Sequence, residues 1–253
     1  MYIFATAINL LNVKAMRKLF TMVVALAAFA SSALALDNEP KEGITAQAFL
    51  GFNASKIRGL GYDGKIGGLA GFKFEYVLPK AHGTYINAGI DWTQKGAKRK
   101  FKDWPVGPML ISNGTGKYNL HYIEIPIHVG FHYNFNQDIG VFGEFGPYFG
   151  IGVGGKRKLT YDNDGTPFRD AEWDYKVFKK STQPNRNNFQ RWDAGLGFRV
   201  GAEYNQHYIL ALGCDWGLTD MWRDDFRDVE ADRLRFLKDV KNFNFYMTLG
   251  YRF

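Results

Sequence analysis

The stretch NFNFYMTLGYRF, residues 242–253, alternates apolar and polar side chains over its whole length. Side chains on a β-strand point to opposite faces in turn, so a strand here carries two different faces. The apolar face holds Phe243, Phe245, Met247, Leu249, Tyr251 and Phe253. The opposite face holds Asn242, Asn244, Tyr246, Thr248, Gly250 and Arg252. No proline or charge interrupts the apolar face, and the stretch therefore predicts an unbroken strand.

Seven further stretches with a similar alternation precede this one. They span residues 44–53, 66–77, 84–94, 118–133, 139–158, 189–204 and 208–218. The connections alternate between short turns and long loops. The turns are 78–83, 134–138 and 205–207, and the loops are 54–65, 95–117, 159–188 and 219–241. Strands of this length, in even number and joined in this way, are typical of barrels that cross a membrane. We therefore predict an all-β fold, an eight-stranded antiparallel transmembrane β-barrel.

The second face of the strands indicates which side of the barrel meets lipid. A soluble barrel turns its apolar face inward, and a membrane barrel turns it outward. In residues 189–204 the other face is Arg191, Asp193, Gly195, Gly197, Arg199, Gly201 and Glu203. So many glycines suit a narrow lumen, because eight strands enclose little space. Aromatic residues near strand ends resemble an interfacial girdle: Tyr76, Trp92, Tyr133, Trp192, Tyr204, Tyr208, Trp216 and Tyr251.

Composition excludes several other classes of protein. The 253 residues are 46% hydrophobic and 17% aromatic, but the mean hydropathy of −0.28 is too low for a helical membrane protein. The single cysteine, Cys214, excludes an intrachain disulfide and a cysteine-cluster metal site. The net charge is +7, and the basic residues are mixed with acids along the chain, which argues against nucleic-acid binding. No cofactor is expected.

The N-terminal region has the pattern of an export signal. A basic segment at residues 16–18 is followed by an apolar run at 19–30 and by Ala-Leu-Ala at 33–35. An apolar run of this length is too short to span a bilayer, and the small residues fit a cleavage site. We predict a signal peptide over residues 1–35 and a single barrel domain over 36–253. The extension before Met16 is unusual for a signal peptide, which suggests Met16 as the true start.

Three short motifs follow one another in the mature chain. They are YIEIPI at residues 122–127, GPYFG at 146–150 and RWDAGLG at 191–197. Their order and spacing resemble the PorT-like outer-membrane β-barrel proteins of Bacteroidota, and the resemblance covers essentially the whole mature chain. It implies an outer-membrane location and implies little about activity.

The last strand adds a second resemblance, to the closing strand of bacterial outer-membrane barrels. In those proteins the last strand carries the signal that the barrel-assembly machinery reads. The resemblance implies that Tyr251 and Phe253 act as the assembly signal, with that machinery as a partner.

Polar residues of the inward face are the candidate site. We predict a lumenal polar network of Glu124, His128, Glu144, Arg191, Asp193, Arg199, Glu203 and Arg252. A metal site is the alternative, because Glu124, His128 and His132 share one face, with Glu144 or Asp193 as added ligands. Positions four apart on a strand are about 13 Å apart, so one strand cannot supply a single metal site. No zinc-site spacing occurs either, and the expected metal is none.

The residues favour a structural or interaction role for a monomeric barrel, acting through its four external loops. One alternative is a barrel enzyme that acts on envelope lipid, which needs a histidine beside a serine or carboxylate at the outer rim. His121 is the only rim histidine, with Ser112 or Asp103 as partner. The other alternative is a narrow pore with a water path past Arg199, Glu203 and Arg252.

The expected surroundings are outer-membrane lipids and lipopolysaccharide. Two basic clusters, Lys98-Arg99-Lys100 and Lys156-Arg157-Lys158, are expected at the outer rim. They either contact lipopolysaccharide phosphates, which bind cations in charge-assisted hydrogen bonds, or form a solvated positive collar.

Overall fold

A computed structural model describes residues 43–106, 109–162, 172–178, 189–221 and 240–253. This part of the chain forms nine β-strands. They are β1 (Gly43–Arg58), β2 (Asp63–Val77), β3 (Thr84–Val106), β4 (Met109–Asn134), β5 (Ile139–Asp162), β6 (Glu172–Lys176), β7 (Trp192–Tyr204), β8 (Tyr208–Gly217) and β9 (Lys241–Arg252). The predicted signal peptide lies outside the described residues. Within them, no helix is long and apolar enough to span a membrane.

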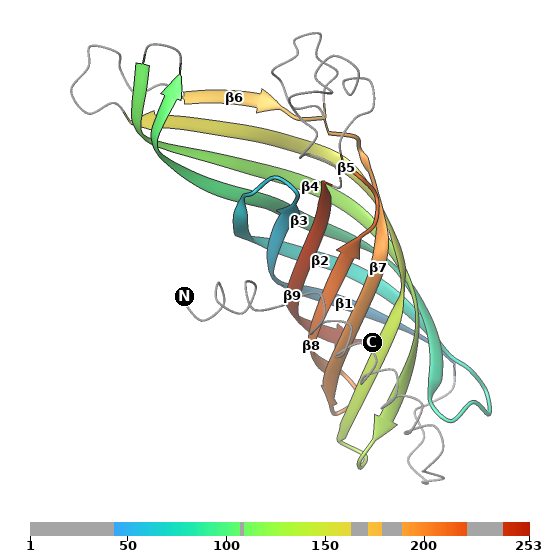
Figure 1. Cartoon of the computed structure of the whole chain (residues 1–253). Helices are drawn as coiled ribbons and strands as arrows, with labels where there is room; N and C mark the ends of the chain where they lie inside the picture. The colour runs from blue at the N-terminus through green and yellow to red at the C-terminus, as the bar shows by residue number, and fades with distance from the viewer. Residues whose placement is uncertain (1–42, 107–108, 163–171, 179–188, 222–239) are drawn as a thin grey trace.

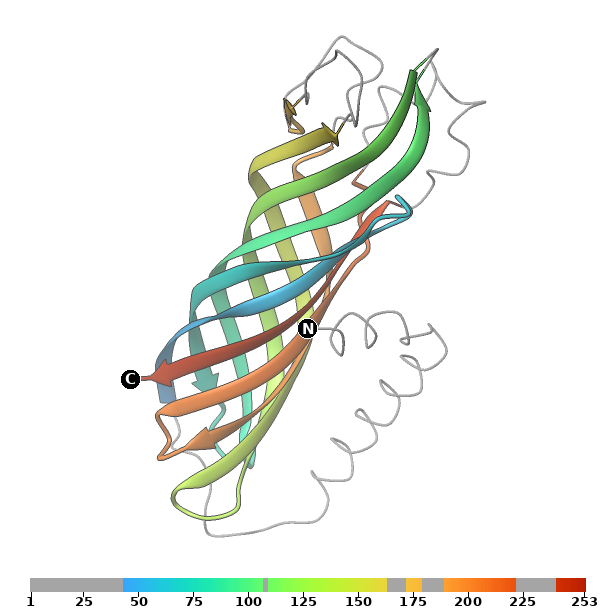
Figure 2. The same cartoon turned by 90° about the vertical axis from the view of Figure 1, so that its left-hand side faces the viewer.

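Eight of the strands close into a ring in which all neighbouring pairs are antiparallel (Figures 1 and 2). Each strand pairs with the next around the ring, and the last strand, β9, returns to pair with β1 from Gln47↔Arg252 to Arg58↔Lys241. The ninth strand, β6, lies outside the ring and pairs with β5. The predicted eight-stranded antiparallel barrel is therefore confirmed.

The apolar side chains of the ring point outward and the polar ones inward, which is the reverse of a soluble barrel. Phe72 and Phe74 of β2 are each about three-fifths exposed, whereas Lys73 and Glu75 between them are buried. Outward residues of the other strands, such as Leu249, are exposed in the same way. Exposed apolar side chains on all sides of a ring are unfavourable in water, because burial from water stabilises them. The outer wall therefore suits lipid.

Aromatic side chains mark the two ends of the apolar wall. Tyr76, Tyr204, Tyr208 and Tyr251 are exposed near the short turns. Trp92 and Trp192 are exposed near the opposite end. Aromatic rings gather in this way at membrane–water interfaces, where one side of the ring is apolar and the other is wet.

Two of the predicted long loops are wrong, because strands occupy most of them. Residues 95–117 belong to β3 and β4, which stay in register from Lys95↔Leu120 to Val106↔Met109. Residues 54–65 are likewise reduced to a turn between Arg58 and Asp63. These segments lie above the apolar wall, where no lipid faces them, and they therefore lack an alternation of apolar and polar residues. Hydrogen bonds between the backbones hold the strands together there. Figure 1 shows β3, β4 and β5 extending together beyond the other strands of the ring.

Strand β5 changes its partner along its length. It pairs with β7 from Ile139↔Tyr204 to Ile151↔Trp192 and with β6 from Lys156↔Lys176 to Thr160↔Glu172. A bulge in the β4–β5 pairing at His121/Tyr122 accompanies the change. Strand β6 occupies part of the predicted loop 159–188. We call the four-stranded upper part of β3, β4, β5 and β6 the external sheet.

Apolar clusters lie near both ends of the lumen. At the mouth, strand residues such as Ile57, Tyr118 and Leu120 pack against Phe178 and Phe189. At the short-turn end, the cluster is Val77, Tyr85, Phe142, Ile209 and Ala211. Most of the polar interior lies between these two clusters, and Arg252 lies level with the lower one.

Candidate functional site

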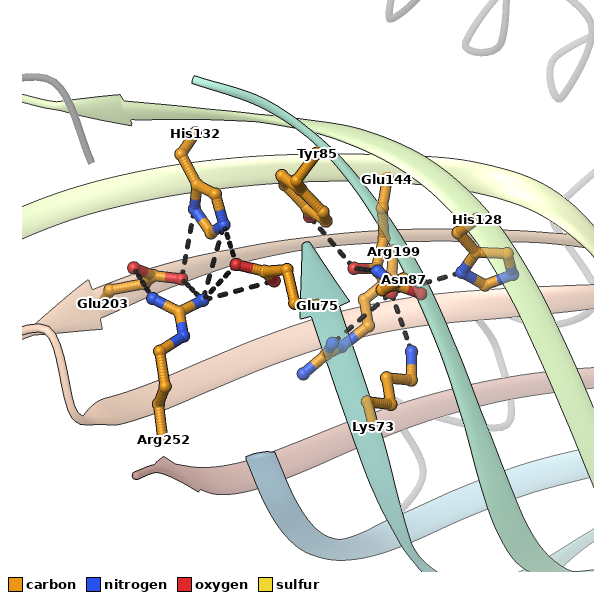
Figure 3. Close-up of polar contacts among 10 residues, drawn as sticks. All are labelled: Lys73, Glu75, Tyr85, Asn87, His128, His132, Glu144, Arg199, Glu203 and Arg252. Atoms are coloured by element: carbon orange, nitrogen blue, oxygen red, sulfur yellow. Dashed lines mark hydrogen bonds and ion pairs between the residues drawn. The ribbon is translucent and has the colours of Figure 1, made fainter. Parts of the chain in front are cut away.

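The first group of lumenal charges lies near the short turns and joins four strands. Arg252 of β9 donates two hydrogen bonds to Glu203 of β7, from Nη1 to Oε2 and from Nη2 to Oε1, each 2.7 Å long. Glu75 of β2 lies 3.4 Å from the same guanidinium and 2.8 Å from Nε2 of His132 on β4. Figure 3 shows these four side chains meeting inside the ring. A bidentate pair of this kind fixes the geometry of both partners.

The second group surrounds Glu144 of β5 at the centre of the lumen (Figure 3). Its partners are Lys73 Nζ at 2.7 Å, Asn87 Nδ2 at 2.7 Å, Tyr85 Oη at 3.0 Å, His128 Nδ1 at 3.2 Å and Arg199 Nη1 at 3.4 Å. Arg199 is almost fully buried and its guanidinium lies 5.0 Å from the centre of the Phe142 ring. Buried charges need such partners, since an unpaired one is very costly.

The third group lies below the mouth, around Lys95 of β3. Its Nζ is 2.5 Å from Glu124 Oε1 and 3.3 Å from Asp193 Oδ2. Asn242 donates to the same Asp193 oxygen at 2.7 Å. The ammonium group also lies 4.7 Å from the centre of the Tyr148 ring, within range of a cation–π interaction.

The structure places seven of the eight predicted network residues in the lumen and one outside it. Glu124, His128, Glu144, Asp193, Arg199, Glu203 and Arg252 belong to the three groups. Arg191 differs from the expectation, because β7 begins only at Trp192 and the Arg191 side chain is exposed. Its Nη1 donates to the Gly152 carbonyl at 3.3 Å. The alternation of inward and outward side chains holds only within a strand, and Arg191 precedes β7.

Sequence reasoning missed several charged partners of this network. The cations Lys73 and Lys95 and the carboxylate Glu75 lie on the inward faces of β2 and β3, and half-buried Asp91 and buried Asp215 line the same lumen. Their signal was present, since Lys73 and Glu75 alternate with Phe72, Phe74 and Tyr76. Which residues meet across the lumen depends on how the ring closes.

The cavity at the centre of the lumen is small. A cavity of about 20 Å³ lies between the second and third groups, lined by His128, Arg199 and Tyr246 among others. That volume holds about one water molecule. Within the described residues no group of three His, Cys, Asp or Glu side chains is placed to hold a metal.

His121, the rim candidate for catalysis, lies on the outer wall. Its ring stacks on Trp92, with centroids 5.7 Å apart and an angle of 20° between the planes. The side chains of its candidate partners, Ser112 and Asp103, lie outside the described part of the structure.

An open groove lies where β5 leaves β7 and joins β6. Lys156 of β5, Lys176 at the end of β6 and Arg191 before β7 line it, over Val153 and Phe178. Its volume is about 330 Å³. We call this the seam groove.

Comparison with known proteins identifies the family. The model of the outer membrane protein beta-barrel domain matches residues 30–223. The chain belongs to the outer membrane protein beta-barrel domain family. The barrel is therefore an outer-membrane protein, with its apolar wall in the bilayer. Barrels of this kind place short turns in the periplasm and long connections outside, so the external sheet and the seam groove lie at the outer face.

Several solved outer-membrane barrels are similar to this chain. The attachment invasion locus protein Ail of Yersinia pestis, in complex with the heparin analogue sucrose octasulfate, is 14% identical over 84% of this chain and 100% of its own, with a TM-score of 0.37. Neisserial surface protein A is 11% identical over 85% and 98%, with a TM-score of 0.40. OprG from Pseudomonas aeruginosa is 11% identical over 85% and 98%, with a TM-score of 0.38. No curated protein matches.

The predicted basic clusters of this outer-membrane barrel form rows across the external sheet. Lys98, Lys117 and Lys158 are direct cross-strand neighbours on β3, β4 and β5. They lie on the face opposite Ala97 and Tyr118, which pack into the mouth cluster. Like charges directly opposite one another destabilise a sheet, so a row of this kind favours an anionic neighbour. Asp174 of β6 is the cross-strand neighbour of Lys158.

Proposed function

We propose that this protein is a monomeric outer-membrane anchor that acts through its external sheet and loops, without catalysis. The single observation that supports this best is the filled lumen. Three groups of ion pairs and two apolar clusters occupy it, and the cavity between the second and third groups measures about 20 Å³. A barrel of this kind offers its outer end, rather than its interior, for contact with partners.

The external sheet is the element with the greatest reach. Strands β3 and β4 continue in register to Val106↔Met109, well past the last pairing of β3 with β2 at Asp63↔Lys98. Paired strands form a stiffer arm than a loop, because their backbone groups are hydrogen-bonded to each other. Its exposed Lys100 and Lys176 suit anionic partners. Outer-membrane lipids, including lipopolysaccharide, are the partners we propose at the level of the wall.

The enzyme and pore alternatives receive no specific support. His128 and His132 are buried in ion-pair groups, and His121 stacks on Trp92. For a pore, the described lumen would need a water path past Arg199, Glu203 and Arg252. Arg252 instead binds Glu203 at both nitrogens, and Arg199 is buried against Glu144 and Phe142.

Membership of the PorT-like group is supported by how its three motifs meet. Glu124 of the first motif, Gly150 of the second and Asp193 of the third are cross-strand neighbours on β4, β5 and β7. A Cβ on Gly150 would lie 3.3 Å from Glu124 Oε1 and 3.5 Å from Asp193 Cβ. The glycine therefore leaves room for two carboxylates that share Lys95. We infer that the motifs form one structural unit.

We also infer an export signal before the barrel and an assembly signal in its last strand. Residues 1–35 contain the signal peptide, in a chain of Bacteroidota origin. Tyr251 and Phe253 act as the signal for the barrel-assembly machinery. Both are exposed, and the Tyr251 ring makes edge contacts with Tyr208 and Phe253 at centroid distances of 5.6 and 5.3 Å.

A photo-crosslinking experiment in outer membranes tests the anchor role. A photoreactive amino acid replaces the exposed Lys100 of the external sheet, and the control carries it at Gln137 in a periplasmic turn. We expect a discrete adduct from position 100 and none of the same mass from position 137. Equal labelling at the two positions, or stepwise ion conductance of the purified barrel in a planar bilayer, would contradict the proposal.

A further inference from the structure

The seam groove brings together three cations from three separate segments. Lys156 and Lys176 are cross-strand neighbours on β5 and β6, and Arg191 comes from the segment that enters β7. The Lys176 and Arg191 side chains are exposed. Arg191 is held in place by its bond to the Gly152 carbonyl, and its backbone oxygen accepts from the Gly152 N–H at 2.7 Å. A guanidinium has five N–H donors, so further donors stay available to a ligand.

The groove is apolar as well as basic. Val153 on its β5 side is more than half exposed, and Phe178 contributes a ring from the mouth cluster. Cations beside an exposed apolar side chain suit an amphiphile, whose head carries negative charge and whose chain is apolar. A small soluble anion would use the cations and leave Val153 in water.

The position of the groove matches the level of lipid headgroups. It starts directly beyond the Ile151↔Trp192 pair, where β5 and β7 separate. Trp192 is two-thirds exposed on the wall, and tryptophans of this kind lie at the membrane–water boundary. Below the pair the wall is apolar, and above it the external sheet carries lysines.

We propose that the seam groove binds the phosphorylated headgroup of an outer-leaflet glycolipid. Lys156, Lys176 and Arg191 contact the phosphate oxygens, and an acyl chain runs down the wall past Val153 and Trp192. Arginine and lysine are the side chains that bind phosphate most readily, through charge-assisted hydrogen bonds. This inference rests on the proposed lipid contact of the barrel and gives that contact one defined site.

The competing explanation is a diffuse positive collar, in which lysines of the external sheet attract anionic lipid without a defined site. The row of Lys98 and Lys117, with Lys100 beside it, provides the matched control for this explanation. The variant K156Q/K176Q/R191Q removes three positive charges from the groove. The variant K98Q/K100Q/K117Q removes three from the collar.

The test measures lipid binding to the folded full-length barrel in detergent micelles by native mass spectrometry. The probes are lipid A with its phosphates and the same lipid after dephosphorylation. Heat-dependent migration on SDS gels verifies that each variant is folded. We expect the groove variant to bind phosphorylated lipid A about tenfold more weakly, as the loss of three weak ion pairs implies, and the collar variant to change less than about twofold. Millimolar inorganic phosphate should not compete, and dephosphorylated lipid A should bind the wild type weakly.

Three other outcomes of this experiment would each refute a different part of the proposal. Equal losses in the two variants would favour the collar and refute the site. Effective competition by inorganic phosphate would refute a lipid ligand. Absence of binding by the wild type would refute the proposed lipid contact itself, without touching the closed-barrel anchor. If the triple variant does not fold, K156Q/K176Q keeps the Arg191 bond to Gly152 and should still lose about fivefold.

Discussion

Single residues in the lumen carry unusually large energetic consequences. Glu144 is buried and contacts the cationic groups of Lys73 and Arg199 as well as His128. In a medium of low dielectric constant, removing one charge of such a set leaves the others uncompensated, which costs more than the intact set contributes. The lumen is also tightly packed, since small residues of one strand face large side chains of the next.

Replacing Glu144 by glutamine should destabilise the barrel by about 3–5 kcal/mol, because two buried cations lose their counter-charge. The measurement is the free energy of unfolding by urea, with the barrel in detergent micelles. Asp63→Asn, an exposed carboxylate at the start of β2, is the control and should change stability by less than about 0.5 kcal/mol. A loss no greater than the control would mean that water, rather than Glu144, compensates the lumenal cations.

Gly213→Ala should destabilise the barrel by about 1–3 kcal/mol through overpacking. Gly213 of β8 lies opposite Tyr246 of β9, and a Cβ there would approach the Tyr246 ring to 2.4 Å. At Gly143 of β5 the nearest atom to an added Cβ is Val200 Cγ1, at 3.8 Å. Gly143→Ala should therefore be tolerated. Similar unfolding midpoints for the two variants would contradict this account of the lumenal glycines.

Among the elements, β5 shapes the outer end of the molecule. By exchanging β7 for β6 it opens the seam groove and supports the external sheet. The tip of the β3–β4 hairpin is different, because above the Asn113↔Asp162 pair β4 has only β3 beside it among the described strands. The barrel should therefore not depend on that tip.

Replacing residues 103–112 by Asn-Gly should leave the barrel intact. The two new residues join Lys102 and Asn113, which are already cross-strand neighbours, and Asn-Gly favours a two-residue hairpin turn. We expect heat-dependent SDS migration to persist and the free energy of unfolding to stay within about 0.5 kcal/mol of wild type. Loss of the folded band would show that the tip takes part in barrel formation.

The elements also show what sequence can predict. The eight strands and three short turns follow from alternation, which is a local signal where lipid lies on one side. The extension of β3 and β4 does not, because KGAKRKFK at residues 95–102 has no alternation and pairs through its backbone. In the lumen, the inward side of Glu124, Glu144 and Asp193 follows from alternation. Their partners do not, since Lys73 and Glu144 are 71 positions apart and meet only across the closed ring.

At the scale of the whole molecule, the apolar wall sets the position of the barrel in the bilayer. Phe72→Arg, in the middle of β2, should weaken folding into lipid vesicles by about 2–4 kcal/mol, because the charge lies at depth. Tyr204→Arg, at the interfacial end of β7, should cost about 0–1 kcal/mol. Both side chains are more than half exposed on the wall, so the two variants differ mainly in how deep the new charge lies in the bilayer. Equal costs would contradict the assigned position of the bilayer.

The closed interior that we propose also bears on how a cell can use this protein. An open barrel adds a leak with every copy, which limits how many an outer membrane tolerates. Here Arg252, Glu203 and Glu75 bridge the lumen at one end, and the mouth cluster fills it at the other. Under the proposed anchor function, the membrane therefore keeps its resistance to small toxic solutes however many copies it holds, and the abundance of the protein is free to vary with the demand for its surface.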